Sequence, residues 1–143
     1  MDKTITAKEY LSQIHSINTR LKSLVSQRQS IMDSLYNISP KLSHTPKAAS
    51  PDIHRMDGLI AAKLDIESEM EAASLKLAGI HKTISAITGA ELGAVLTYRY
   101  IDHMPWPDVA KELFLSESRV YQLHREALAA IESIITESEV KSA

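Results

Sequence analysis

Few side chains in this sequence have a type and spacing that suits catalysis or metal binding. The 143 residues include six histidines and no cysteine, and no two histidines lie four apart, as one helix face would need to hold a metal ion. No glycine-rich phosphate loop is present, and Glu67, Glu69 and Glu71 are typical of a solvent-facing helix rather than of an acid–base pair. We therefore expect no metal site, no cofactor and no enzymatic activity.

The most informative polar residues lie near the start of the last predicted helix, which Ser116 caps. Its inward face is predicted to hold Val120, Leu123, Ala127, Leu128, Ile131 and Ile135. Helical geometry places Glu117, Ser118, Tyr121 and Gln122 on the opposite face. This face offers an amide, a carboxylate, a phenol and a hydroxyl for hydrogen bonding.

Two further helices are predicted to position this face. Leu92, Val95, Leu96 and Tyr100 share one face of a helix that residues 102–105 break. A short helix follows from Trp106 to Leu113, where Pro107 is tolerated because the first turn needs no backbone donor there. A short helix, a tight turn and a longer helix with a polar first turn form the helix-turn-helix plan, whose second helix enters the major groove of DNA.

Residues 92–131 resemble the helix-turn-helix of sigma-70 region 4. The segment 106–128 fits that pattern without gaps, and its signature residues are Ser116, Arg119, Val120, Gln122, Leu123, Ala127 and Leu128. With Arg99-Tyr100-Ile101 before it and a helical hairpin with a proline-rich loop upstream, the whole chain resembles small phage late-transcription regulators of the RinA/ArpU kind.

The resemblance implies a sequence-specific regulator that binds double-stranded DNA near RNA polymerase, in the cytoplasm of a bacterial host. It implies that the base-contacting residues are Glu117, Ser118, Tyr121 and Gln122. Gln122 suits adenine, Glu117 suits the amino group of cytosine, and Tyr121 suits a thymine methyl or a phosphate. The available phosphate contacts are Arg99, Lys111, Arg119 and Arg125.

Two features depart from that pattern. Phe114 stands in the turn where the family often has glycine, and a positive φ there would cost a bulky residue about 1 kcal/mol or more. Such a turn can instead be rearranged, or Phe114 can pack into a partner. Residues 91–135 also carry four Lys/Arg against seven Asp/Glu, whereas DNA-binding modules usually have a basic surface. We therefore expect weak DNA binding by this module alone.

The first 89 residues are predicted to form a long antiparallel helical hairpin of coiled-coil type. A capping box at Thr6 and Glu9 opens the first helix. The apolar seam of that helix is Ile14, Ile17, Leu21, Leu24, Ile31, Leu35 and Ile38, and the seam of the second is Met56, Leu59, Ile66, Met70, Ala73, Leu77, Ile80, Ile84 and Ile87. Arg28 and Lys63 interrupt these seams, and we expect their charged ends to reach water.

The hairpin boundaries follow from proline and glycine. Three prolines between Ser39 and Pro51 predict a loop, and a second helix is expected from near Asp52 to Thr88, with Gly89 as its left-handed end. Apolar positions outside the seams, at Leu11, Val25, Met32 and Ile134, favour a homodimer.

The predicted fold class is therefore all-α, with a hairpin over 1–89, a helix-turn-helix unit over 90–136 and a flexible tail over 137–143. No membrane span or signal region is expected. Two alternatives to a transcription regulator stay open: a phage DNA-packaging subunit of the small terminase kind, and a helical interaction protein without DNA binding.

Overall fold

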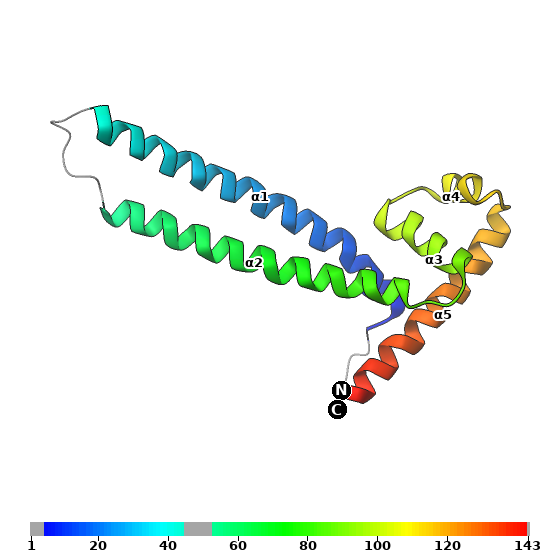
Figure 1. The fold of residues 1–143 in the computed structure, drawn as a ribbon. Coiled ribbons are helices and arrows are strands. Elements are labelled where there is room, and N and C mark those ends of the chain that lie inside the picture. The colour runs from blue at the N-terminus through cyan, green and yellow to red at the C-terminus, as the bar shows by residue number, and fades with distance from the viewer. Residues whose placement is uncertain (1–4, 45–52, 143) are drawn as a thin grey trace. The chain divides into compact units, whose positions relative to one another are not determined.

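The computed structural model describes residues 5–44 and 53–142, with side chains at 5–38 and 53–137, and in these ranges it is helical with no strand. The elements are α1 (Ala7–His44), α2 (Ile53–Ser85), α3 (Ala90–Leu96), the π-helical segment η1 (Thr97–Ile101), α4 (Trp106–Leu113) and α5 (Glu117–Ser142) (Figure 1). The all-α prediction is confirmed. No membrane-spanning helix is found within the described ranges.

The chain divides into two compact units. Residues Met1–Ile17 and Lys76–Ala143 form one, which we call the terminal unit, and Asn18–Leu75 form the other, the distal hairpin unit. The first turns of α1 and the last turns of α2 therefore belong to the same unit as α3, η1, α4 and α5. The predicted domain boundary at Gly89 falls inside the terminal unit, because α1 and α2 each contribute residues to both units.

The start of α1 is capped by the Thr6 side chain, as predicted, and the Glu9 side chain reaches back to the Thr6 hydroxyl. The hydroxyl of Thr6 accepts the backbone N–H of Glu9 at 3.2 Å and donates to the Glu9 carboxylate at 3.0 Å. The backbone N–H of Ala7 donates to the carboxylate of Glu132 on α5 at 3.3 Å, although 125 residues separate them in sequence. These bonds fix the first turn of α1 within the terminal unit.

The two predicted seams are confirmed, because every apolar seam position on α1 and α2 is buried or half-buried. Arg28 and Lys63 keep partly exposed side chains, as predicted, but both are also paired, which the sequence did not predict. The Arg28 guanidinium lies 2.7 Å from the Glu67 carboxylate, and the Lys63 ammonium lies 3.3 Å from the same group. Glu67 therefore neutralises both seam cations, and the Arg28 bond lowers the pKa of its carboxyl group below the ordinary value.

Several predicted helix ends are also wrong. Helix α1 continues through Pro40 to His44, so Pro40 does not end it. Helix α2 ends at Ser85, where Ile87 N–H donates to the Ile84 carbonyl at 3.2 Å and tightens the last turn. Residues 45–52 of the predicted loop lie outside the described residues.

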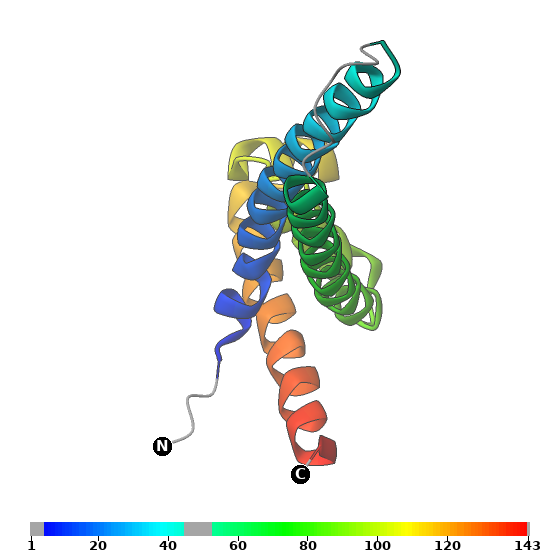
Figure 2. The same ribbon diagram turned by 90° about the vertical axis from the view of Figure 1, so that its left-hand side faces the viewer.

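Gly89 and the C-terminal segment also differ from expectation. Gly89 has φ 113° and ψ 114°, outside the left-handed helical region, and it precedes α3 instead of closing α2. Helix α5 continues to Ser142 through the segment expected to be a flexible tail (Figure 2).

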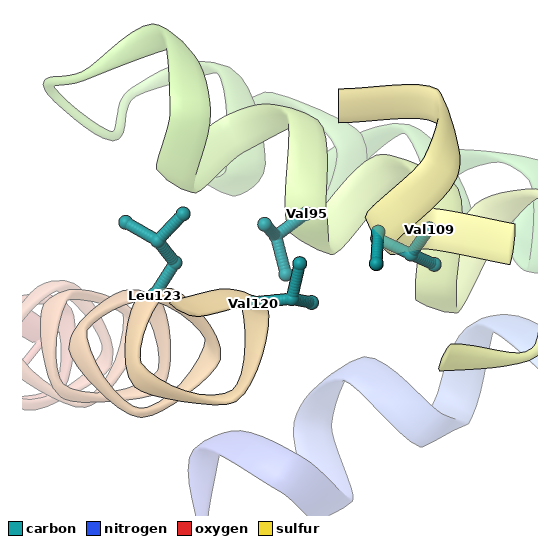
Figure 3. Packing of buried hydrophobic residues seen from close by; sticks show 5 residues of the cluster. Val95, Val109, Val120 and Leu123 are labelled. Atoms are coloured by element: carbon teal, nitrogen blue, oxygen red, sulfur yellow. The ribbon is translucent and has the colours of Figure 1, made fainter. Parts of the chain in front are cut away.

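Helices α3, α4 and α5 share one core within the terminal unit. Its buried residues are Val95, Val109, Ala110, Val120 and Leu123 (Figure 3). Each fully buried valine or leucine contributes about 1.5–3 kcal/mol relative to exposure. The small side chain of Ala110 lies in this core, as the helix-turn-helix pattern predicts for the point where the two helices meet.

Candidate nucleic-acid interface

The turn between α4 and α5 has a defined hydrogen-bonding pattern. The Leu115 N–H donates to the Ala110 carbonyl at 3.0 Å, and the Phe114 N–H donates to the Lys111 carbonyl at 3.2 Å. This pair of bonds is the Schellman motif, which ends a helix on one left-handed residue. The Ser116 hydroxyl then accepts the Arg119 N–H at 3.1 Å and starts α5, so the predicted cap is confirmed.

Phe114 is the left-handed residue of this motif, with φ 58° and ψ 40°. The turn is therefore not rearranged to avoid the positive φ, and the backbone bears a cost of about 1–2 kcal/mol. The Phe114 side chain is 93% exposed, so no intramolecular packing offsets that cost.

The four predicted base-contacting side chains lie together on one surface. Glu117, Ser118, Tyr121 and Gln122 are all exposed on the first two turns of α5, while Val120 and Leu123 are buried beneath them. The Tyr121 ring centroid lies 5.2 Å from that of Trp106 at the start of α4, and Tyr121 remains 41% exposed. One of the four side chains is thus held in place by an aromatic neighbour.

The four predicted phosphate contacts differ in their surroundings. Lys111 and Arg125 are exposed, and Arg119 is half-buried. Arg99 donates to the Met104 carbonyl at 2.9 Å and places its guanidinium 4.6 Å from the centre of the Trp106 ring. Arg99 therefore also stabilises the turn between η1 and α4, which the sequence did not predict.

A second contact joins η1 to α5. The Tyr100 hydroxyl lies 2.8 Å from Nε2 of His124, and the His124 ring centroid lies 4.6 Å from that of Trp106. Burial raises the pKa of Tyr100 and, together with the charges of Lys8, Arg99 and Arg125, lowers the pKa of His124. Near pH 7 this hydrogen bond therefore joins a neutral phenol to a neutral imidazole.

The π-helical segment has a direct role in this arrangement. The Asp102 N–H donates to the Thr97 carbonyl five residues earlier, at 3.0 Å. In this widened turn the consecutive residues Arg99 and Tyr100 contact different partners. Arg99 stacks on the Trp106 ring, and Tyr100 is hydrogen-bonded to His124. Sequence periodicity gives no signal for such a turn.

The family comparison covers most of this region. A model described as "Protein of unknown function (DUF1492)" matches residues 41–132, and the chain belongs to that family. The match includes α4, the turn and the predicted base-contacting face of α5. A search of the curated proteins gave no match, and neither did a search of the solved structures.

Proposed function

We propose that this member of the DUF1492 family is a sequence-specific DNA-binding regulator of transcription, acting near RNA polymerase in the bacterial cytoplasm as a phage or prophage late-gene activator. The observation that carries the proposal is the polar face of α5. Four side chains able to bond to base edges are exposed on its first two turns, directly after a helix-ending turn and a Ser116 cap.

In the proposed complex, the N-terminal half of α5 enters the major groove, and α4 crosses the DNA backbone. Gln122 and Glu117 then distinguish bases by hydrogen bonds, while Lys111 and Arg125 contact phosphates in a sequence-independent way. Tyr121, supported by Trp106, meets the groove with little loss of side-chain freedom.

The proposal includes a homodimer formed through the distal hairpin unit. One flank of this unit is charged, with Arg20 on α1 paired to Glu69 on α2 at 2.6 Å. The other flank of the unit, next to the seam, is apolar and exposed. Its residues are Val25, Met32, Tyr36, Ile53, Ile60 and Leu64. A second hairpin packed on that flank completes a four-helix bundle.

Two of the four positions that the sequence predicts for the dimer interface are not exposed in the structure. Leu11 is fully buried inside the terminal unit and is not available to a partner. Ile134 is half-buried, whereas Val25 and Met32 are exposed as predicted.

The test is selection of binding sites from random duplex DNA by the full-length chain. We expect one enriched sequence, bound more tightly than random duplex by a factor of about 10³ or more. Absence of any enriched sequence, with the folded chain confirmed by circular dichroism, contradicts the proposal.

A further inference from the structure

The terminal unit contains an open cleft of about 560 Å³ beside the base-contacting face. Its walls come from the first turns of α1, the η1 segment and the turn after it, the start of α4 and the middle of α5. All of these segments belong to the same compact unit. Trp106 lines the cleft on one side and contacts Tyr121 of the base-contacting face on the other.

The charge of this cleft is opposite to that of the surrounding sequence. Its lining includes Lys8, Arg99, His15, His103 and His124 but no carboxylate. The segment 91–135 has a net charge of −3, so α1 supplies cationic character that the helix-turn-helix segment lacks. The lowered pKa of His124 has the same origin in part, since the charges of Lys8 and Arg99 act on its ring.

The donors of the cleft are held in place before any ligand binds. Arg99 donates one of its five N–H groups to the Met104 carbonyl, and its guanidinium stacks on the Trp106 ring. These two contacts fix the guanidinium and leave its other N–H groups available to a ligand. His103 has a positive φ of 57°, a strained state for a residue with a side chain, and its ring meets that of His15 edge to face at 5.1 Å.

These histidines do not form a metal centre. Among the described residues, no group of three or more histidine or carboxylate side chains could hold an ion. A cleft lined by the Lys8 and Arg99 cations and by imidazole groups, without a carboxylate, suits an oxyanion. Phosphate is the oxyanion that best uses a planar guanidinium beside an ammonium group.

We propose that this cleft binds a phosphate group of the DNA backbone, and that the first turns of α1 are part of the DNA interface. The inference rests on the proposed function, because that function identifies DNA as the source of the phosphate. It adds a cation from outside the acidic segment 91–135, because Lys8 of α1 joins Arg99, which the segment itself contributes.

The single tryptophan of the chain gives a direct measurement, because Trp106 lines the cleft. We would titrate the full-length chain with a random-sequence duplex, with a mononucleotide and with inorganic phosphate, following Trp106 fluorescence. The duplex is expected to change the fluorescence at micromolar concentration. The mononucleotide and inorganic phosphate are expected to act only at far higher concentration, since each offers a single contact site.

Two variants test the cleft itself. Ser12→Glu places a carboxylate on the exposed α1 wall of the cleft and is expected to weaken duplex binding by about tenfold or more. Lys8→Gln is expected to reduce the slope of log K against log salt concentration by about one unit. Lys82→Gln is the matched control, because Lys82 is exposed in the same unit but does not line the cleft.

The outcomes separate this inference from the proposed function. Duplex binding that depends on Gln122 but is unchanged by Ser12→Glu and Lys8→Gln overturns the inference and leaves the proposed function standing. A fluorescence change with mononucleotide at micromolar concentration, without duplex binding, overturns the DNA source and the proposed function together. No change with any of the three ligands overturns the phosphate site. Circular dichroism and the thermal midpoint confirm that each variant is folded.

Discussion

The hydroxyl of Tyr100 lies 2.8 Å from Nε2 of His124 and links the π-helical segment η1 to helix α5. Because burial raises the pKa of the phenol and lowers that of the imidazole, the bond joins two neutral groups near pH 7. The contact between η1 and α5 therefore includes a half-buried histidine whose protonation is disfavoured in the folded chain.

The first prediction is that the terminal unit loses stability as the pH falls. The His124 pKa is lowered in the folded chain, so the unfolded chain takes up a proton first, near the ordinary value of about 6.5. The stabilisation is complete above that pH and is lost as the pH falls from there toward the folded pKa. Thermal midpoints measured between pH 8 and pH 5 are expected to fall, and His124→Gln is expected to reduce this dependence. An identical pH profile for the variant contradicts the assignment.

The second prediction concerns Phe114, which is strained in its backbone and exposed in its side chain. Phe114→Gly removes the left-handed strain of about 1–2 kcal/mol but adds about 0.5–1 kcal/mol of backbone entropy to the unfolded state. A net gain of up to about 1.5 kcal/mol in the free energy of unfolding is expected. Phe114→Ala keeps the strain and serves as the control, with no gain expected. Urea unfolding checks both, and a loss of stability in the glycine variant counts against the left-handed turn.

The third prediction concerns the ion pairs of the distal hairpin unit. Glu67 neutralises two half-buried cations, Arg28 and Lys63, whereas Glu69 pairs with Arg20 at an exposed site. Glu67→Gln is therefore expected to lower the thermal midpoint more than Glu69→Gln, since an exposed pair contributes about 0–1 kcal/mol. Because the Glu67 pKa is lowered, its contribution is present above the ordinary pKa and disappears as the pH falls through the folded value. Equal effects of the two variants at pH 7 contradict a special role for Glu67.

Local signals in the sequence were enough to predict the helix-turn-helix. Pro107 and Ser116 mark the starts of α4 and α5 through their own backbone chemistry, and the seven-residue period marks the seams of α1 and α2. The exposure of Gln122 follows from its position opposite the inward face formed by Val120, Leu123 and Ala127. Each of these features depends on residues within one or two helical turns.

Features that depend on distant contacts were not predicted. The pairing of Arg28 with Glu67 requires the axial register between two helices, which a single helical period does not specify. The π-helical turn and the contacts of Trp106 with Arg99 and His124 depend on how three elements pack. The cleft was missed for the same reason, because Lys8 and His124 are 116 positions apart in the chain and only the fold brings them to one cavity.

The fourth prediction is that the full-length chain is a dimer at tens of micromolar. Leu64 is 59% exposed on the apolar flank of the distal hairpin unit, so Leu64→Glu leaves the fold of one copy intact but places a charge in the proposed interface. Sedimentation is expected to show a dimer for the unmodified chain and a monomer for this variant. Ala72→Glu adds the same charge at an exposed position toward the Arg20–Glu69 flank and is expected to remain dimeric. A monomer of the unmodified chain contradicts the proposed dimer.

The last prediction separates base contacts from phosphate contacts on α5. Gln122 is exposed and offers an amide to a base edge, so Gln122→Ala is expected to cost about 1–3 kcal/mol on the selected site and almost nothing on random duplex. Arg125 is exposed on the same helix, and Arg125→Ala is expected to weaken binding on every sequence and to reduce the salt slope by about one unit. Arg119 is half-buried, so its alanine variant is compared only after its thermal midpoint is measured. The decisive comparison is the double variant Gln122→Ala with Tyr121→Ala, because both side chains lie on the exposed face and neither belongs to the core. If this folded double variant keeps full affinity and selectivity for the selected site, α5 does not contact the bases and the proposed recognition surface is wrong.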